Sequence, residues 1–318
     1  MTSLKRLALA STMATFVLVA IGGLVRATKS GLGCGTHWPD CSGAVIPFFG
    51  NRAVIIEFSH RLMASVVVFL LAVLVVAAWR QRRTNARIMW TAVLAFGLVL
   101  FQAVLGAMVV WLELKAESVV LHLLTALTLV AVLIYLTISA YVADGSITPA
   151  TDARIARNGR SAAGAVLVLL LVGSYVTGRD AGYIFTDWPL MGGQVIPDLS
   201  FEPAAIHFLH RALALVAGIV VIAVGFAIVR RGNELPHQAR LARAAMGLFA
   251  VQVLIGALNV WNPPPGVGNE LLVTAHLLVA AGIWGCLVAL TVVSHPSMAI
   301  NFSAQSSIRT HPAYQGGA

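Results

Sequence analysis

Charged residues are scarce in this sequence. They make up 10% of its 318 residues, whereas 59% are hydrophobic and the mean hydropathy is +0.88. That composition lies far outside the range of soluble globular domains. The sequence also lacks a phosphate-binding glycine loop, a hydrolase nucleophile elbow and a Ser/His/Asp set, so nucleotide-driven transport gains no support. We therefore predict an all-α integral membrane protein.

Eight apolar stretches are long enough to span a bilayer, which takes about 20 residues. They cover roughly residues 7–25, 55–79, 88–111, 118–142, 161–178, 204–229, 240–260 and 270–293. Most arginines and lysines lie on one side of these spans, which the positive-inside rule assigns to the cytoplasm. Both termini are therefore expected there. This placement explains the net charge of +9 without a nucleic-acid partner. With no Arg- and Ser-rich leader before residue 7, a bacterial plasma membrane is expected.

The chain contains a tandem duplication. Residues 101–111, FQAVLGAMVVW, match residues 251–261, VQVLIGALNVW, and the same offset of 150 residues relates several shorter matches. Each repeat holds four spans, and an even number inserts both repeats the same way up, related by an axis along the membrane normal. We predict two tandem four-helix bundles in one orientation. The expected parts are bundles at 1–145 and 161–295, a cytoplasmic linker at 146–160 and a disordered cytoplasmic tail at 296–318.

Four of the nine histidines lie at similar depth, near the external ends of the even-numbered spans: His60, His122, His210 and His276. Histidine is costly inside a bilayer and needs a partner. Two histidines facing inward at one depth of a four-helix bundle can fill both axial positions of a haem iron. Each half carries one such pair, so we predict two haem-iron sites. Interhelical hydrogen bonding is the alternative. Zinc is weaker, because two ligands per half fall short of four.

Other polar residues accompany these histidines. Arg61 and Arg211 each follow a candidate ligand directly, and a guanidinium group matches a haem propionate in geometry. Snorkelling to the lipid headgroups is the alternative. Glu57 lies on the same helix face as the first candidate ligand, whereas the second half has His207 in its place. One half thus offers a carboxylate beside its haem site. The alternative for Glu57 is an acid that neutralises Arg61 or Arg52.

Cysteine is scarce, and two of the three cysteines share one loop. Cys34 and Cys41 lie in the first external loop, where an oxidising compartment permits a disulfide. The matching positions of the second half are Ile184 and Met191, so this feature belongs to one repeat. Cys286, inside the last span, is expected to be an ordinary buried thiol.

Taken together, these motifs resemble those of heme A synthase, of the bacterial and mitochondrial type, over residues 1–295. The resemblance is carried by the E-x-x-H-R of residues 57–61, the second H-R at 210–211, the later histidines His122 and His276, and the loop with Cys34 and Cys41. It suggests an actinobacterial-type bacterial member. It also implies that the two cysteines form the disulfide found in a subset of bacterial members.

The resemblance implies an oxidoreductase that converts the C8 methyl group of heme O into a formyl group, giving heme A for cytochrome c oxidase. The implied course is two successive hydroxylations, to an alcohol and to a geminal diol, followed by loss of water. The implied cofactor is a heme b, with its iron, at His210 and His276. Substrate heme O would be bound at His60 and His122, with Glu57 as the essential acid.

Heme O synthase is the implied substrate donor, and cytochrome c oxidase assembly is the implied acceptor of the product. The electron-transfer partner, the oligomeric state and the role of His207 stay open. Two other functions would use the same four histidines. One is a quinol-linked dihaem membrane electron carrier, and the other is a haem-binding transporter. Both would leave the haem chemically unchanged, whereas the enzyme yields heme A from heme O.

Overall fold

The computed structural model describes residues 2–262 and 267–298. In these residues the chain forms eight long helices and one short 3-10 helix, η1, at Ala181–Tyr183. The long helices are α1 (Thr2–Ala27), α2 (Arg52–Trp79), α3 (Ala86–Trp111), α4 (Ala116–Ala143), α5 (Ala153–Gly178), α6 (Glu202–Val229), α7 (Pro236–Trp261) and α8 (Val267–Ser294). All eight are long and apolar enough to cross a membrane. The predicted all-α, multi-pass membrane fold is confirmed.

The helix α5 begins earlier than its hydropathy indicates, at Ala153 instead of residue 161. Asp152 caps it, and its carboxylate accepts hydrogen bonds from the backbone N–H groups of Arg154 (2.9 Å) and Ile155 (3.1 Å). The second half of the expected 146–160 linker is therefore helical. The expected tail at 296–318 lies almost wholly outside the described residues.

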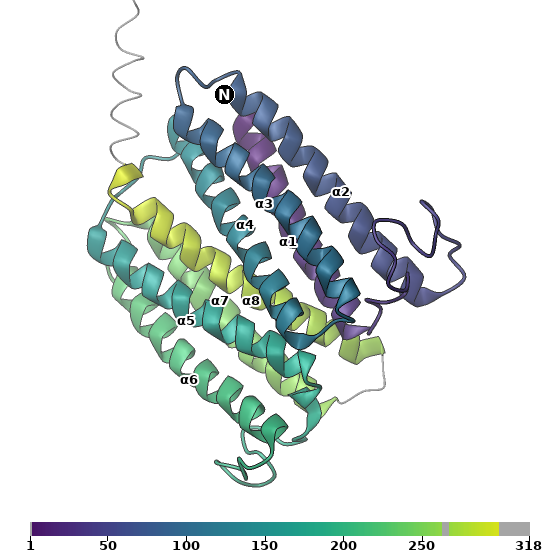
Figure 1. The fold of residues 1–318 in the computed structure, drawn as a ribbon. Helices are drawn as coiled ribbons and strands as arrows, with labels where there is room; N and C mark the ends of the chain where they lie inside the picture. The colour runs from purple at the N-terminus through teal and green to yellow at the C-terminus, as the bar shows by residue number, and fades with distance from the viewer. Residues whose placement is uncertain (1, 263–266, 299–318) are drawn as a thin grey trace, which may run out of the picture.

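The eight helices fall into two groups of four, which we call the N-half (α1–α4) and the C-half (α5–α8). In each half the four helices contact one another in a closed ring, and α1 and α4 contact α8 and α5 where the halves meet. Each half has a hydrophobic core, and the core of the C-half also includes Leu127 and Val130 of α4. The helices run roughly along one common direction (Figure 1). The superposition of the two halves in one orientation stays a prediction.

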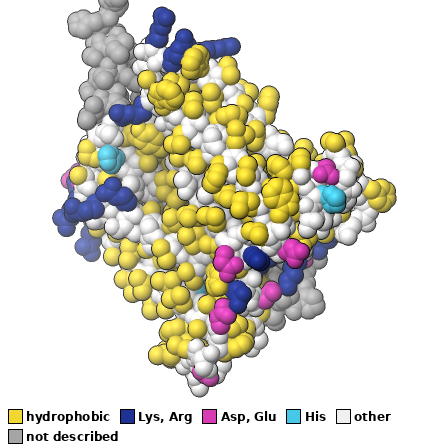
Figure 2. All heavy atoms as spheres, in the orientation of Figure 1, with side chains coloured by type: hydrophobic (Ala, Val, Ile, Leu, Met, Phe, Trp, Pro, Cys, Tyr) yellow, Lys and Arg dark blue, Asp and Glu magenta, His cyan; other side chains and the backbone are white. Residues whose placement is uncertain are grey.

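Side-chain type follows the axis of the helices. Hydrophobic side chains cover the helix surfaces, and Lys and Arg gather at the end where α1 begins and α8 ends (Figure 2). We call this the basic end and the other the loop end, because the two long loops, 28–51 and 179–201, lie there.

The two long loops share the same local structure. Backbone bridges join Cys41 to Ala44 in the first and Met191 to Gln194 in the second. An edge-on ring contact holds each loop to its own half, between Trp38 and Trp111 (6.4 Å between centroids) and between Trp188 and Trp261 (6.1 Å). Every residue here has its counterpart 150 positions along the chain. The duplication therefore extends to the loops.

Membrane orientation can be tested with alkaline phosphatase fused at loop glycines. The positive-inside rule predicts that the loop end is external. We expect the enzyme to be active in fusions at Gly43 and Gly193, which lie in the long loops, and inactive in a fusion at Gly145, which follows α4. The opposite pattern of activity would overturn the predicted orientation.

Candidate functional site

One continuous cavity of about 1930 Å³ runs through both halves, and all eight helices contribute to its lining. Most lining residues are apolar, as in sites for small-molecule ligands, although this cavity is larger than most. The polar groups that reach it include four histidines from four helices: His60 of α2, His122 of α4, His210 of α6 and His276 of α8. The structure thus brings all four predicted haem ligands to the wall of one cavity.

Each of these imidazole rings packs against a glycine of the preceding helix. A methyl group added to the glycine would lie 3.0 to 3.4 Å from the ring carbon Cε1 in the pairs Gly22–His60, Gly106–His122, Gly173–His210 and Gly256–His276. Gly106 and Gly256 lie in the duplicated segments 101–111 and 251–261, so the repetition marks them. Gly22 and Gly173 carry no such sequence signal, because the local sequence does not show which imidazole ring a helix face will contact.

The same four rings share a polar atom without a partner. In each of them Nδ1 is buried and makes no hydrogen bond. A buried polar atom is normally hydrogen-bonded, because leaving it unpaired costs free energy. Four such atoms, two in each half, fit rings that are held for a ligand rather than for helix packing. A planar metal porphyrin with two imidazole ligands suits this donor set.

Zinc is the alternative that the histidines also raised. Within residues 2–262 and 267–298, no three His, Cys, Asp or Glu side chains are grouped so that they could hold a metal ion.

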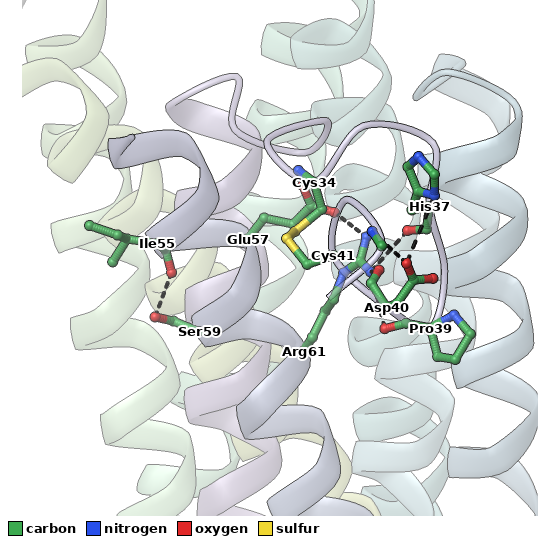
Figure 3. Close-up of a disulfide and its surroundings, with 10 residues drawn as sticks. Cys34, His37, Pro39, Asp40, Cys41, Ile55, Glu57, Ser59 and Arg61 are labelled. Atoms are coloured by element: carbon green, nitrogen blue, oxygen red, sulfur yellow. Dashed lines mark hydrogen bonds and ion pairs between the residues drawn. A yellow bond between two sulfur atoms is a disulfide. The ribbon is translucent and has the colours of Figure 1, made fainter. Parts of the chain in front are cut away.

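Glu57 connects the cavity wall to the disulfide loop. Its side chain is buried, with 3% exposed, and it lines the cavity. One carboxylate oxygen accepts a hydrogen bond from the backbone N–H of Cys34 (2.8 Å), and the other pairs with Arg61 (2.5 Å; Figure 3). Cys34 and Cys41 form a disulfide bond. The ion pair with Arg61 was expected under the alternative interpretation, in which Glu57 only neutralises an arginine. The carboxylate also lines the cavity, however, as the proposed reactive role requires.

The two arginines that follow the histidines hold the long loops. Nη1 of Arg61 donates to the backbone carbonyls of His37 (3.0 Å) and Asp40 (2.7 Å). Nη1 of Arg211 donates to the equivalent carbonyls, those of Asp187 (3.2 Å) and Leu190 (2.8 Å). Most of their donors are therefore engaged within the protein. The propionate role expected for both arginines stays a prediction, and the contacts that the structure gives them are with the loops.

His207, which sequence reasoning left without a role, is the C-half counterpart of Glu57. Its Nδ1 lies 2.9 Å from the carbonyl oxygen of Ala181, and its Nε2 accepts a hydrogen bond from Nε of Arg211 (3.0 Å). A neutral ring with the proton on Nδ1 satisfies both contacts. Glu57 and His207 thus both tie the arginine one turn later to the backbone of a loop. The difference between them is the carboxylate charge.

The second loop is also held by Asp187. Its carboxylate accepts hydrogen bonds from the backbone N–H groups of Gly193 and Gly192, at 2.8 Å each. These bonds lower the pKa of Asp187 from its ordinary value. Gly192 and Gly193 have positive φ (64° and 76°), a backbone conformation that would be strained in a residue with a side chain.

The fold and the cavity together define a multi-pass membrane protein whose large apolar site is walled by pairs of histidines. The chain belongs to the COX15-CtaA family of cytochrome oxidase assembly proteins, whose sequence pattern matches residues 5–288.

Several relatives that are named heme A synthase cover nearly the whole chain. The one from Symbiobacterium thermophilum is 29% identical over 303 residues, which is 93% of this chain and 97% of the relative. The one from Halalkalibacterium halodurans is 28% identical over 306 residues, 94% of this chain and 99% of the relative. A third, from Rhizorhabdus wittichii, is 29% identical over 317 residues.

The role of Arg211 as a loop anchor can be tested by proteolysis. Arg211→Gln removes the donors to the carbonyls of the second loop, and hydrogen bonds from a charged group stabilise by about 1.5 to 3 kcal/mol. We expect chymotrypsin to cleave the 179–201 loop roughly tenfold faster in this variant. Arg179→Gln is the matched control, since the side chain of Arg179 forms an exposed ion pair with Glu202 and such pairs contribute little to stability. Equal cleavage rates in Arg211→Gln and the unaltered protein would refute the anchoring role.

Proposed function

We propose that this protein is a heme A synthase, which oxidises the C8 methyl group of heme O to a formyl group. The observation that carries this proposal is the set of four cavity-facing imidazoles, one pair in each half, whose buried Nδ1 atoms lack partners. The family and the names of relatives that match along nearly the whole chain support the same activity and do not favour an electron carrier or a transporter.

The two pairs of histidines would have different tasks. His210 and His276 would hold a heme b cofactor in the C-half, and His60 and His122 would hold substrate heme O in the N-half. Bound heme b would supply a redox-active iron. The support for this assignment is Glu57, because the N-half places a cavity-lining carboxylate three residues before its first histidine, where the C-half has His207. The apolar lining would exclude water and leave the substrate's reactive edge beside that carboxylate.

Glu57 would act as the charged group of the reaction. Its carboxylate is fixed from two sides, by Arg61 and by the N–H of Cys34, so it needs no reorganisation when a substrate reacts. A carboxylate held in this way can stabilise positive charge that develops on a methyl carbon, or can accept its proton. The disulfide loop would then serve as a clamp that keeps the Cys34 N–H in place.

The partners follow from the same proposal. Heme O synthase would supply the substrate, and the product would pass to cytochrome c oxidase assembly. The protein would lie in the bacterial plasma membrane with its basic end, and so both termini, on the cytoplasmic side.

The proposed activity is tested by pigment analysis. The chain is expressed together with a heme O synthase in a host that makes no heme A, and the haems are extracted and separated. The enzyme yields heme A. An electron carrier or a transporter yields only unaltered haems, so the absence of heme A in cells that contain the folded protein would exclude the proposal.

Haem binding in the C-half is tested at its two ligands. His210→Ala or His276→Ala should abolish the low-spin, bis-imidazole spectrum of the haem that is purified with the protein. His237→Ala is a suitable control, because His237 is an exposed histidine at the basic end that contacts Arg240. Should either alanine variant keep the spectrum of the unaltered protein, the residue is not a ligand.

The role of Glu57 is tested by Glu57→Gln. The amide keeps the size of the side chain but removes its charge, so heme A formed per folded protein should fall by roughly a hundredfold or more. Heme O or its hydroxylated form should accumulate, and the haem of the C-half should remain. Glu202→Gln, at an exposed site of the same end, is the control. A purely structural role predicts less protein with normal turnover, and that result would remove Glu57 from the reaction.

A further inference from the structure

Arg26, near the loop end of α1, is a cation at the cavity wall with unpaired N–H donors. It lines the cavity, and its Nε is buried and has no hydrogen-bond partner. Its Nη2 makes one long hydrogen bond, to the carbonyl oxygen of Thr177 in α5 (3.3 Å). Asp180 is the acid that acts on Arg26 through space, but its carboxylate pairs with Lys29 (3.2 Å). Arg26 forms no ion pair with an acid in the described part of the chain.

The position of Arg26 relates it to the substrate ligand. Arg26 comes four residues after Gly22, the glycine against which the His60 ring packs. Residues four apart share one helix face, and the rise is about 1.5 Å per residue. The arginine therefore lies on the same side of α1 as the His60 ring, roughly one turn (about 6 Å) closer to the loop end.

The C-half lacks this cation. The equivalent residue, four after Gly173, is Thr177, and its hydroxyl group bonds back to the carbonyl of Gly173 (3.2 Å). The C-half has no charged residue of its own at that position, and the charged group that reaches the backbone of Thr177 is Arg26 itself. Arg26 is therefore a second difference between the halves, and like Glu57 it belongs to the N-half.

The chemistry of Arg26 suits a carboxylate. A guanidinium group carries five N–H donors in a fixed planar fork, which matches the two oxygens of a carboxylate. Burying part of that fork without a partner costs free energy, which a bound anion would offset. Arg61 and Arg211 differ in this respect, because loop carbonyls together with Glu57 or His207 take their donors.

We propose that Arg26 binds a propionate carboxylate of the haem that is held between His60 and His122. This inference rests on the proposed function for the identity of that haem. It assigns the propionate edge of the substrate to the loop end of the cavity, beside α1, and it moves the anion-binding role from Arg61 to a residue with free donors.

The test pairs a change in the protein with a change in the ligand. Purified protein that retains its C-half haem is titrated with heme O and with heme O dimethyl ester, whose propionates are uncharged, and the Soret band follows binding. Arg26→Gln should weaken heme O binding roughly ten- to hundredfold, the scale of a charge-assisted hydrogen bond. The ester should bind the unaltered protein more weakly by a similar factor, and the two ligands should bind Arg26→Gln equally well.

Three controls separate the outcomes. Arg179→Gln removes an equal charge from the exposed Arg179–Glu202 pair at the same end, neither member of which lines the cavity, and should leave heme O affinity unchanged. Arg26→Lys should keep part of the preference for the acid over the ester. The ester titration of the unaltered protein needs no variant, so equal binding of the two ligands would overturn the proposal even if Arg26→Gln does not fold.

Two results would overturn the proposal. One is that heme O and its ester bind the unaltered protein equally well. The other is that Arg26→Gln keeps the full preference for the acid, or loses the C-half haem in place of the titrated one. Conversion of heme O to heme A is measured in the same preparation. If Arg26→Gln abolishes the preference for the acid over the ester but no heme A forms, the proposed enzymatic function fails and the assignment of Arg26 stands.

Discussion

A polar ring inside a bilayer must find a partner, and this constraint organises the molecule. Each half places two imidazoles at the cavity wall and supports each ring on a glycine of the neighbouring helix. The glycines leave room for the rings, yet no side chain or carbonyl satisfies their Nδ1 atoms. Packing that carries four unpaired buried nitrogens is costly by itself. The rings are therefore held at the cavity at some cost to the stability of the helix assembly.

Duplication supplied the scaffold, and a few substitutions at the loop end separate the tasks of the halves. In both halves an arginine after the histidine ligand holds the loop carbonyls. The N-half adds two charges at the cavity, Glu57 and Arg26, where the C-half has the neutral residues His207 and Thr177. A fixed anion and a fixed cation suit a half that must orient a substrate and react with it. Neutral positions suit a half that only retains a cofactor.

Much of this arrangement could be predicted from the sequence, because hydropathy and repetition are local signals. Hydropathy predicted the eight spans, and the repetition singled out the four histidines. The start of α5 was missed, because the cap at Asp152 begins this helix earlier than hydropathy indicates. Contacts between elements could not be predicted in this way. Arg61 follows a histidine in sequence, yet its guanidinium group donates a hydrogen bond to a carbonyl of the first long loop. The sequence pattern does not show where that loop folds. Arg26 could not be singled out from the sequence, because a lone arginine at a helix end resembles any interfacial charge. Only the folded structure shows that its Nε is buried without a partner.

The central claim is that the two pairs of histidines hold two haem irons, one in each half. X-ray diffraction at the iron absorption edge, from crystals of the protein grown with heme O, tests it most directly. The account predicts two anomalous peaks per chain, one between His60 and His122 and one between His210 and His276. A single peak, or an iron held by any other pair of residues, would contradict it.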